Sequence, residues 1–118
     1  MPVTVIVMIL VGMILMGMIL VCAQRLADRL SSPYKIGENY FIRSVTYHYT
    51  GKLVKVTKSE LILMNAAWIA DDGRFTEAVA TGSFNEVEPY PTGREIVIGR
   101  GAIVDALAID FPLPTKQK

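Results

Sequence analysis

The sequence has few of the residues from which active sites and metal centres are built. It contains one histidine and one cysteine, and none of its carboxylates is set in a pair against a plausible base. Asp71 and Asp72 precede Gly73, but a calcium loop needs more oxygen ligands at alternate positions than this turn supplies. A lone cysteine forms no intramolecular disulfide, so the fold does not depend on an oxidising compartment. We therefore expect a non-enzymatic protein without a metal site or another cofactor.

Charge is missing from the first part of the chain. Residues 2–23 contain no charged side chain, and only Thr4 and Cys22 have any polarity. At about 1.5 Å per residue, such a run crosses the ~30 Å hydrocarbon core of a bilayer. No basic stretch precedes it, which disfavours a cleaved signal peptide, and Val21 is too large for the position before a lipoprotein cysteine. We expect a transmembrane helix that includes residues from Val3 to Val21.

This helix is expected to extend over residues 1–30, the last part being a cytoplasmic extension. Basic residues follow the span and none precedes it, so the positive-inside rule places the C-terminal domain in the cytoplasm and the span in the inner membrane. Gly12 and Gly17 lie five apart, so the close-packing motif with glycines four apart is absent. Two alternatives stay open, a lipid-facing anchor and a pore-lining helix. The anchor is favoured because a pore of Ile, Leu, Val and Met tends to dewet.

The region after the predicted helix has the pattern of a small all-β domain. Five segments are rich in β-branched and aromatic residues and are bounded by turn residues, at 39–48, 51–57, 60–69, 95–99 and 102–109. Lys58 and Ser59 predict a tight hairpin turn. An insert at about residues 70–94 carries a predicted short helix at 76–81, and its prolines indicate a loop. The predicted organisation is a linker at 31–38, a β domain at 39–111 and a flexible tail at 112–118.

Two segments of this β region resemble the Sm-like family of ring-forming barrels. In GKLVKVTKSELILMNA, six residues fall close to the glycine and apolar positions of the first family motif: Gly51, Leu53, Val56, Leu61, Leu63 and Ala66. Around Arg100 and Gly101, the pattern resembles the arginine-glycine core of the second motif. The resemblance implies a five-stranded Sm-like or SH3-like barrel that assembles as a homo-oligomeric ring. The β region is also similar to small uncharacterised phage and prophage proteins, which implies no activity.

The sequence departs from the family where Sm-like proteins bind RNA. The turn at residues 57–60 is one residue shorter than the loop that carries the family's aspartate and asparagine, and Asn65 lies within the third predicted strand. Half of that pocket is therefore missing. A net charge of +1 is also too low to attract nucleic acid strongly. Nucleic acid is consequently a less favoured partner than the lipid bilayer or a second copy of the chain.

The charges are divided unevenly along the chain. Residues 25–60 hold seven basic and three acidic side chains, whereas residues 61–110 hold three basic and eight acidic ones. This division suits a head-to-tail ring, in which the basic edge of one subunit, with Lys52 and Lys55, faces the acidic edge of the next. Alternatively, the basic half faces anionic lipid headgroups. The two interpretations are compatible.

Four further residues are candidates for a ligand site or a subunit interface. Gly99 and Gly101 flank Arg100 within an apolar run, and glycines in a strand mark bulges or close backbone approaches. In a ring, Arg100 would lie near the central opening, where an inter-subunit salt bridge is favoured over a bound phosphate or nucleic-acid backbone. Trp68 is expected to pack in the core or at a subunit interface, or to anchor a partner.

These observations lead to one favoured function and two alternatives. The favoured one is a membrane-anchored homo-oligomeric ring with a structural or pore-like role. The first alternative is a membrane-tethered Sm-like module that binds RNA or other nucleic acid. The second is a phage-derived protein-interaction module that acts through the insert at residues 68–84.

Overall fold

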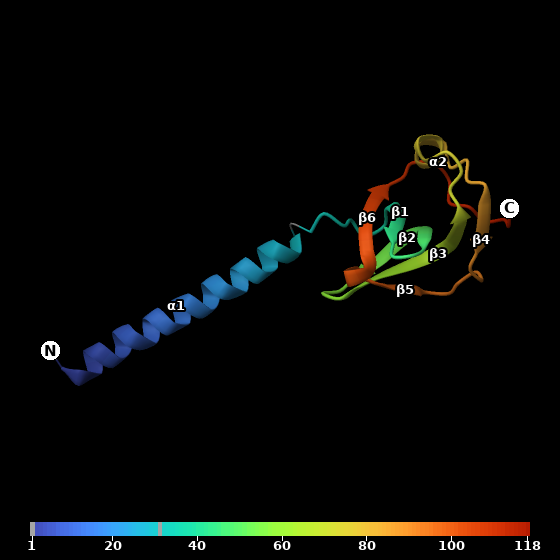
Figure 1. The fold of residues 1–118 in the computed structure, drawn as a ribbon. Coiled ribbons are helices and arrows are strands. Elements are labelled where there is room, and N and C mark those ends of the chain that lie inside the picture. Colours follow the sequence, from blue (N-terminus) through green and yellow to red (C-terminus); the bar gives the residue numbers. More distant parts are fainter. Residues whose placement is uncertain (1, 31) are drawn as a thin grey trace. The chain divides into compact units, whose positions relative to one another are not determined.

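The computed structural model describes residues 2–30 and 32–118, and the chain divides into two units. The first unit extends to Pro33 and contains a long helix. The second unit, Tyr34–Lys118, contains an antiparallel sheet and a short helix (Figure 1).

The helix of the first unit, α1 (Val3–Leu30), has only uncharged residues as far as Gln24. All side chains of residues 2–27 are exposed. Its segment Val3–Ala27 is long and apolar enough to cross a membrane. At about 1.5 Å per residue its 25 residues measure roughly 37 Å, more than the hydrocarbon core requires. The expectation of a long apolar helix at this end is thus confirmed. Gly12 and Gly17 leave open space on its surface.

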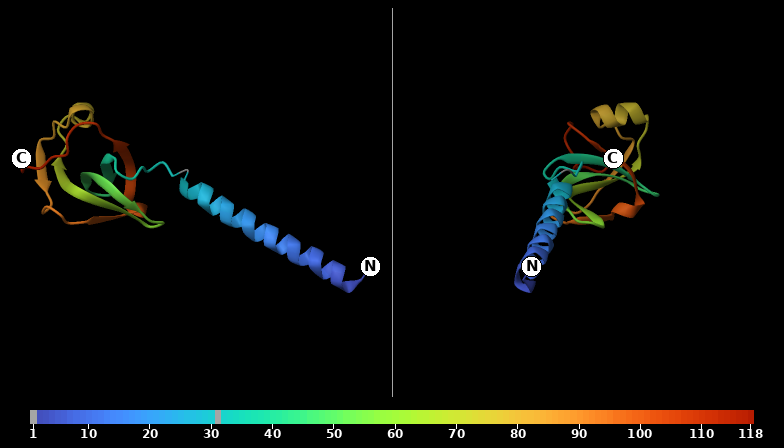
Figure 2. Two further views of the ribbon diagram at one scale, coloured as in Figure 1. Left: turned by 180° about the vertical axis from the view of Figure 1, so that it is seen from behind. Right: turned by 90° about the vertical axis from the view of Figure 1, so that its left-hand side faces the viewer.

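Six strands form the sheet of the second unit: β1 (Asn39–Ser44), β2 (His48–Val56), β3 (Glu60–Asp71), β4 (Glu86–Pro89), β5 (Ile96–Gly99) and β6 (Ile103–Ala108). Their order is β4-β3-β2-β1-β6, and β5 pairs with the first half of β3. Among the described residues no ladder joins β6 to β4 or β5, so hydrogen bonds do not close the sheet into a barrel. The strands nevertheless curve strongly, and α2 (Phe75–Thr81) lies at the opposite end from β5 (Figure 2).

The expected five strands are present, but the sheet has six. The unexpected strand is β4, in a segment where prolines indicated only a loop. Val87 is buried there between two exposed glutamates, and the strand pairs with the second half of β3. The first expected strand also ends early, because the chain bends at residues 45–47 and β2 starts at His48. The tight turn around Lys58 and Ser59 and the short helix of the insert are both confirmed.

Two clusters of buried side chains hold the sheet together, one on each face. Strand β1 contributes to both, since Phe41 belongs to one cluster and Tyr40 and Ile42 to the other. This alternation is what a strand buried on both faces requires. The insert is part of the core, because the cluster around Phe41 also contains Ala78 of α2 and Phe84.

The segments on either side of the sheet have fixed partners. In the predicted linker, the backbone of Gly37 donates to the carbonyl of Leu53, and that of Leu53 donates to the carbonyl of Glu38. In the predicted flexible tail, Lys118 and Val87 exchange two backbone hydrogen bonds of 3.0 and 3.1 Å. The tail therefore occupies part of the outer edge of β4.

Candidate functional site

Arg100 is directed at the turn between β2 and β3. Arg100 is the first residue of the 3-10 helix η1 (Arg100–Ala102). Its Nη1 donates to the carbonyl of Thr57 at 2.8 Å, and its backbone N–H donates to the carbonyl of Ser59. The guanidinium carbon also lies 5.3 Å from the ring centre of Tyr34, a cation-π distance. Within one chain, Arg100 therefore fastens the β2–β3 turn to the end of β5.

The other residues singled out from the sequence are not gathered around Arg100. A Cβ added at Gly99 or Gly101 would meet no atom within 4 Å, so neither glycine is required by a contact within the chain. Lys52 and Lys55 are exposed on β2. Trp68 lies further along β3, opposite Glu88 of β4.

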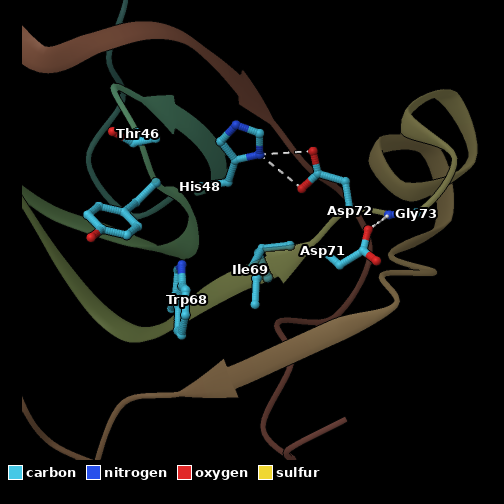
Figure 3. A pocket seen from close by; sticks show the side chains of 9 residues that line it. Thr46, His48, Trp68, Ile69, Asp71, Asp72 and Gly73 are labelled. Carbon is cyan, nitrogen blue, oxygen red and sulfur yellow. Dashed lines mark hydrogen bonds and ion pairs between the residues drawn. The ribbon is translucent and has the colours of Figure 1, made fainter.

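Trp68 instead lies in a surface hollow of about 390 Å³. The connection between β1 and β2 forms one wall and the end of β3 forms the other (Figure 3). Nine residues line the hollow: Thr46, Tyr47, His48, Trp68, Ile69, Ala70, Asp71, Asp72 and Gly73. Trp68 and Tyr47 meet edge to face with ring centres 6.1 Å apart, and their exposed fractions are 37% and 54%. Two large aromatic rings are thus open to solvent on one side of the hollow.

A histidine–aspartate pair forms the other side of the hollow. His48 Nδ1 lies 2.9 and 3.0 Å from the two carboxylate oxygens of Asp72, and the imidazole meets the buried ring of Phe41 edge to face. Because a carboxylate only accepts hydrogen bonds, Nδ1 is the donor in this contact. Nε2 points away from Asp72 (Figure 3) and has no hydrogen-bond partner among the described residues.

Asp71 and Gly73 shape the floor of the hollow through a tight turn. The backbone of Gly73 donates to Asp71 Oδ1 at 2.8 Å. Gly73 has a φ of +72°, and an added Cβ would lie 2.8 Å from a side-chain oxygen of Asn85. Glycine is therefore required at this position. The expectation that these aspartates belong to a surface turn agrees with this geometry, and no group of three metal-binding side chains is found in residues 2–30 and 32–118.

Known proteins give no further indication. No protein-family model matches the sequence, and no curated protein matches it. The function is therefore argued from the geometry alone.

Two charged side chains, Arg43 and Asp105, lie next to His48 across the sheet. Arg43 of β1 lies in register with His48 on one side and with Asp105 of β6 on the other. Arg43 Nε donates to Asp105 at 2.8 Å, Nη2 forms a second contact with the same carboxylate, and the guanidinium lies 4.8 Å from the ring centre of Phe75. These hydrogen bonds lower the pKa of Asp105 and raise the pKa of Arg43. The guanidinium of Arg43, which lies beside His48, is therefore already paired.

Sequence reasoning considered Trp68 and the turn at Asp71–Gly73 separately and did not bring either together with His48. His48 and Asp72 are 24 residues apart, and only the pairing of β2 with β3 brings them together. The signal that could have predicted this contact is the register between β2 and β3. A hairpin turn at residues 57–59 places His48 opposite Ile69, three residues before Asp72.

Proposed function

We propose that the protein is a membrane-anchored structural protein whose β unit assembles with other copies into a homo-oligomeric ring. The observation that carries this proposal is the pair of free strand edges in the β unit. Among residues 2–30 and 32–118, strand β5 pairs only with β3 and β6 pairs only with β1, so each strand keeps one edge without a partner. Exposed backbone edges of this kind are templates for pairing with another chain.

The side chains of these two strands favour an interface. Val97 of β5 is 56% exposed, and Val104 and Leu107 of β6 are 63% and 46% exposed. Joining β5 of one copy to β6 of the next would cover all three. Because the two edges differ, such a contact is head-to-tail, and head-to-tail contacts form a ring when the rotation from one copy to the next closes. The opposite charges of residues 25–60 and 61–110 support the same arrangement.

The Sm-like interpretation belongs to this proposal. When the insert with α2 and β4 is set aside, the remaining strands pair in the order β5-β3-β2-β1-β6, and the free edges are the two ends of this five-stranded sheet. Arg100 follows β5 directly, as the resemblance implies. Its guanidinium is engaged with the Thr57 carbonyl, which favours a structural role for Arg100 over nucleic-acid binding.

Helix α1 is proposed to anchor this ring in the inner membrane, with the β units on the cytoplasmic side. The support is the segment Val3–Ala27, which is long and apolar enough to cross a membrane and has exposed side chains, and the basic residues near its end. A ring of β units brings the same number of anchors together in the bilayer, which gives the structural or pore-like role. The two alternatives for these helices are a lipid-facing anchor and a pore lining. In the first, lipid contacts the helices on all sides, and in the second, water contacts one side.

Native mass spectrometry of the detergent-extracted full-length protein tests the ring. We expect a closed oligomer of one size, and a monomer at all concentrations would refute the proposal. The variant Val104→Lys, which places a charge on the free edge of β6, should yield monomers. The matched control is Ile36→Lys, which changes a residue of similar exposure, 60%, outside the sheet and should keep the oligomer. Equal oligomers from both variants would exclude the β6 edge as the interface.

A further inference from the structure

The hollow beside Trp68 has the features of a binding site that the ring does not explain. It lies at the β4 end of β3, whereas β5 pairs with residues 60–63 at the other end. Trp68 and Tyr47 offer exposed aromatic surface on one side. The faces of such rings are negative at the centre and attract cations, tryptophan most strongly.

The charged groups of the hollow also favour a cation. Asp71 and Asp72 carry its negative charges, and neither a lysine nor an arginine is among the nine lining residues. Strand β4 adds to this field, because Glu86 lies opposite Asp71 and Glu88 lies opposite Trp68. Asp72 accepts a hydrogen bond from His48 Nδ1, whereas Asp71 is paired with no basic side chain among the described residues. An anionic ligand would therefore meet repulsion, and the aromatic rings supply no ligand atoms for a metal ion.

We propose that this hollow binds an arginine or lysine side chain presented by a partner protein. The aromatic rings of Trp68 and Tyr47 contact the cation, and the negative charges of Asp71 and Asp72 attract it into the hollow. Arginine fits better than lysine, because its planar group stacks on aromatic rings. Charge complementarity selects this occupant over a neutral one such as a sugar.

The chain contains its own reporter for this site, because Trp68 is its single tryptophan. The full-length protein in detergent is titrated at constant ionic strength with the blocked peptide Gly-Arg-Gly while Trp68 fluorescence is recorded. The same peptide with citrulline, which has the shape of arginine without its charge, is the control ligand. We expect a saturable change with the arginine peptide and at least tenfold weaker binding of the citrulline peptide.

Two variants test whether the negative charge of Asp71 attracts the cation, with binding measured by the same fluorescence titration. Asp71→Asn keeps a side-chain oxygen that accepts from Gly73 but removes the charge, so it should weaken binding severalfold. Glu77→Gln removes an exposed acidic charge from α2, outside the hollow, and should leave binding unchanged.

Three results would overturn the proposal. These are the absence of a saturable change at millimolar arginine peptide, equal responses to the arginine and citrulline peptides, or a response to a neutral oligosaccharide only. The comparison of two peptides on the unaltered protein does not depend on whether a variant folds. None of these measurements uses the oligomeric state, so the site and the ring are tested separately.

Discussion

The substitution Phe84→Ala tests whether the insert is a structural part of the β unit. Phe84 lies between α2 and β4, in the segment that the sequence marked as an insert, and it is 1% exposed. Its ring stacks on Phe41 at 5.7 Å and meets Phe111 edge to face at 5.9 Å. Phe41 is the β1 residue of this cluster, so Phe84 connects the insert to the centre of the sheet.

The expected loss of stability follows from this burial. Removing a fully buried phenylalanine ring costs about 3–5 kcal/mol, through the lost transfer free energy and the cavity that remains. A unit of this size has a total stability of about 4–13 kcal/mol. The substitution should therefore remove a large part of the free energy of unfolding and lower Tm by about 12 °C or more.

Thermal unfolding of the full-length protein in detergent, followed by circular dichroism at a β-sheet wavelength, measures this loss. Phe75→Ala is the matched control, because Phe75 is also an aromatic residue of the insert but is 44% exposed. It should cost about 1 kcal/mol or less. A loss below about 1 kcal/mol for Phe84→Ala would refute the reasoning and show that the Phe84 ring does not connect the insert to the sheet.

Three further predictions concern stability, each measured by urea unfolding. Arg100→Ala should cost about 1–2 kcal/mol by freeing the β2–β3 turn, and unchanged stability would refute this role. Gly82→Ala should destabilise more than Gly93→Ala, because both have positive φ but only at Gly82 would the Cβ meet a ring, at 2.7 Å; equal losses would contradict the contact. The pKa of Asp105 is lowered by Arg43, so its stabilisation is present above the unfolded value of about 3.9 and is lost as pH falls through the folded pKa. Asp105→Asn should therefore differ from the unaltered protein near neutral pH but not in strong acid, and a constant difference would contradict the pairing.

Local signals in the sequence were sufficient to predict the helix, the main strands and the tight turn. The charge-free run determines α1 without reference to the rest of the chain. The turn is held by the Thr57 side chain, which accepts from the backbone of Glu60 at 2.9 Å, and this is also a local interaction. In contrast, β4 has only one buried residue, Val87, and its partner lies in the second half of β3. So short a strand is specified by its partner and not by its own pattern.

The hollow could have been predicted from the sequence, but only through the register of β2 and β3. Two register shifts interrupt this pairing, one between Thr50 and Lys52 and one between Leu53 and Lys55. They compensate each other, so that His48 lies opposite Ile69, as counting from the turn predicts. The contact of His48 with Asp72 depends on this compensation, because a one-residue slip would move the histidine to the other face of the sheet.

The proposed ring and the proposed binding site act together through multivalency. A ring presents one identical hollow per subunit, so a partner with several basic side chains binds with an effective concentration that a single arginine lacks. Val104→Lys, which should separate the subunits, is then expected to weaken binding of a repeated arginine polymer by about 10²-fold or more. The same variant should leave binding of Gly-Arg-Gly unchanged, because β6 contributes no residue to the lining of the hollow. Equal losses for both ligands would mean that the hollow itself depends on the neighbouring subunit.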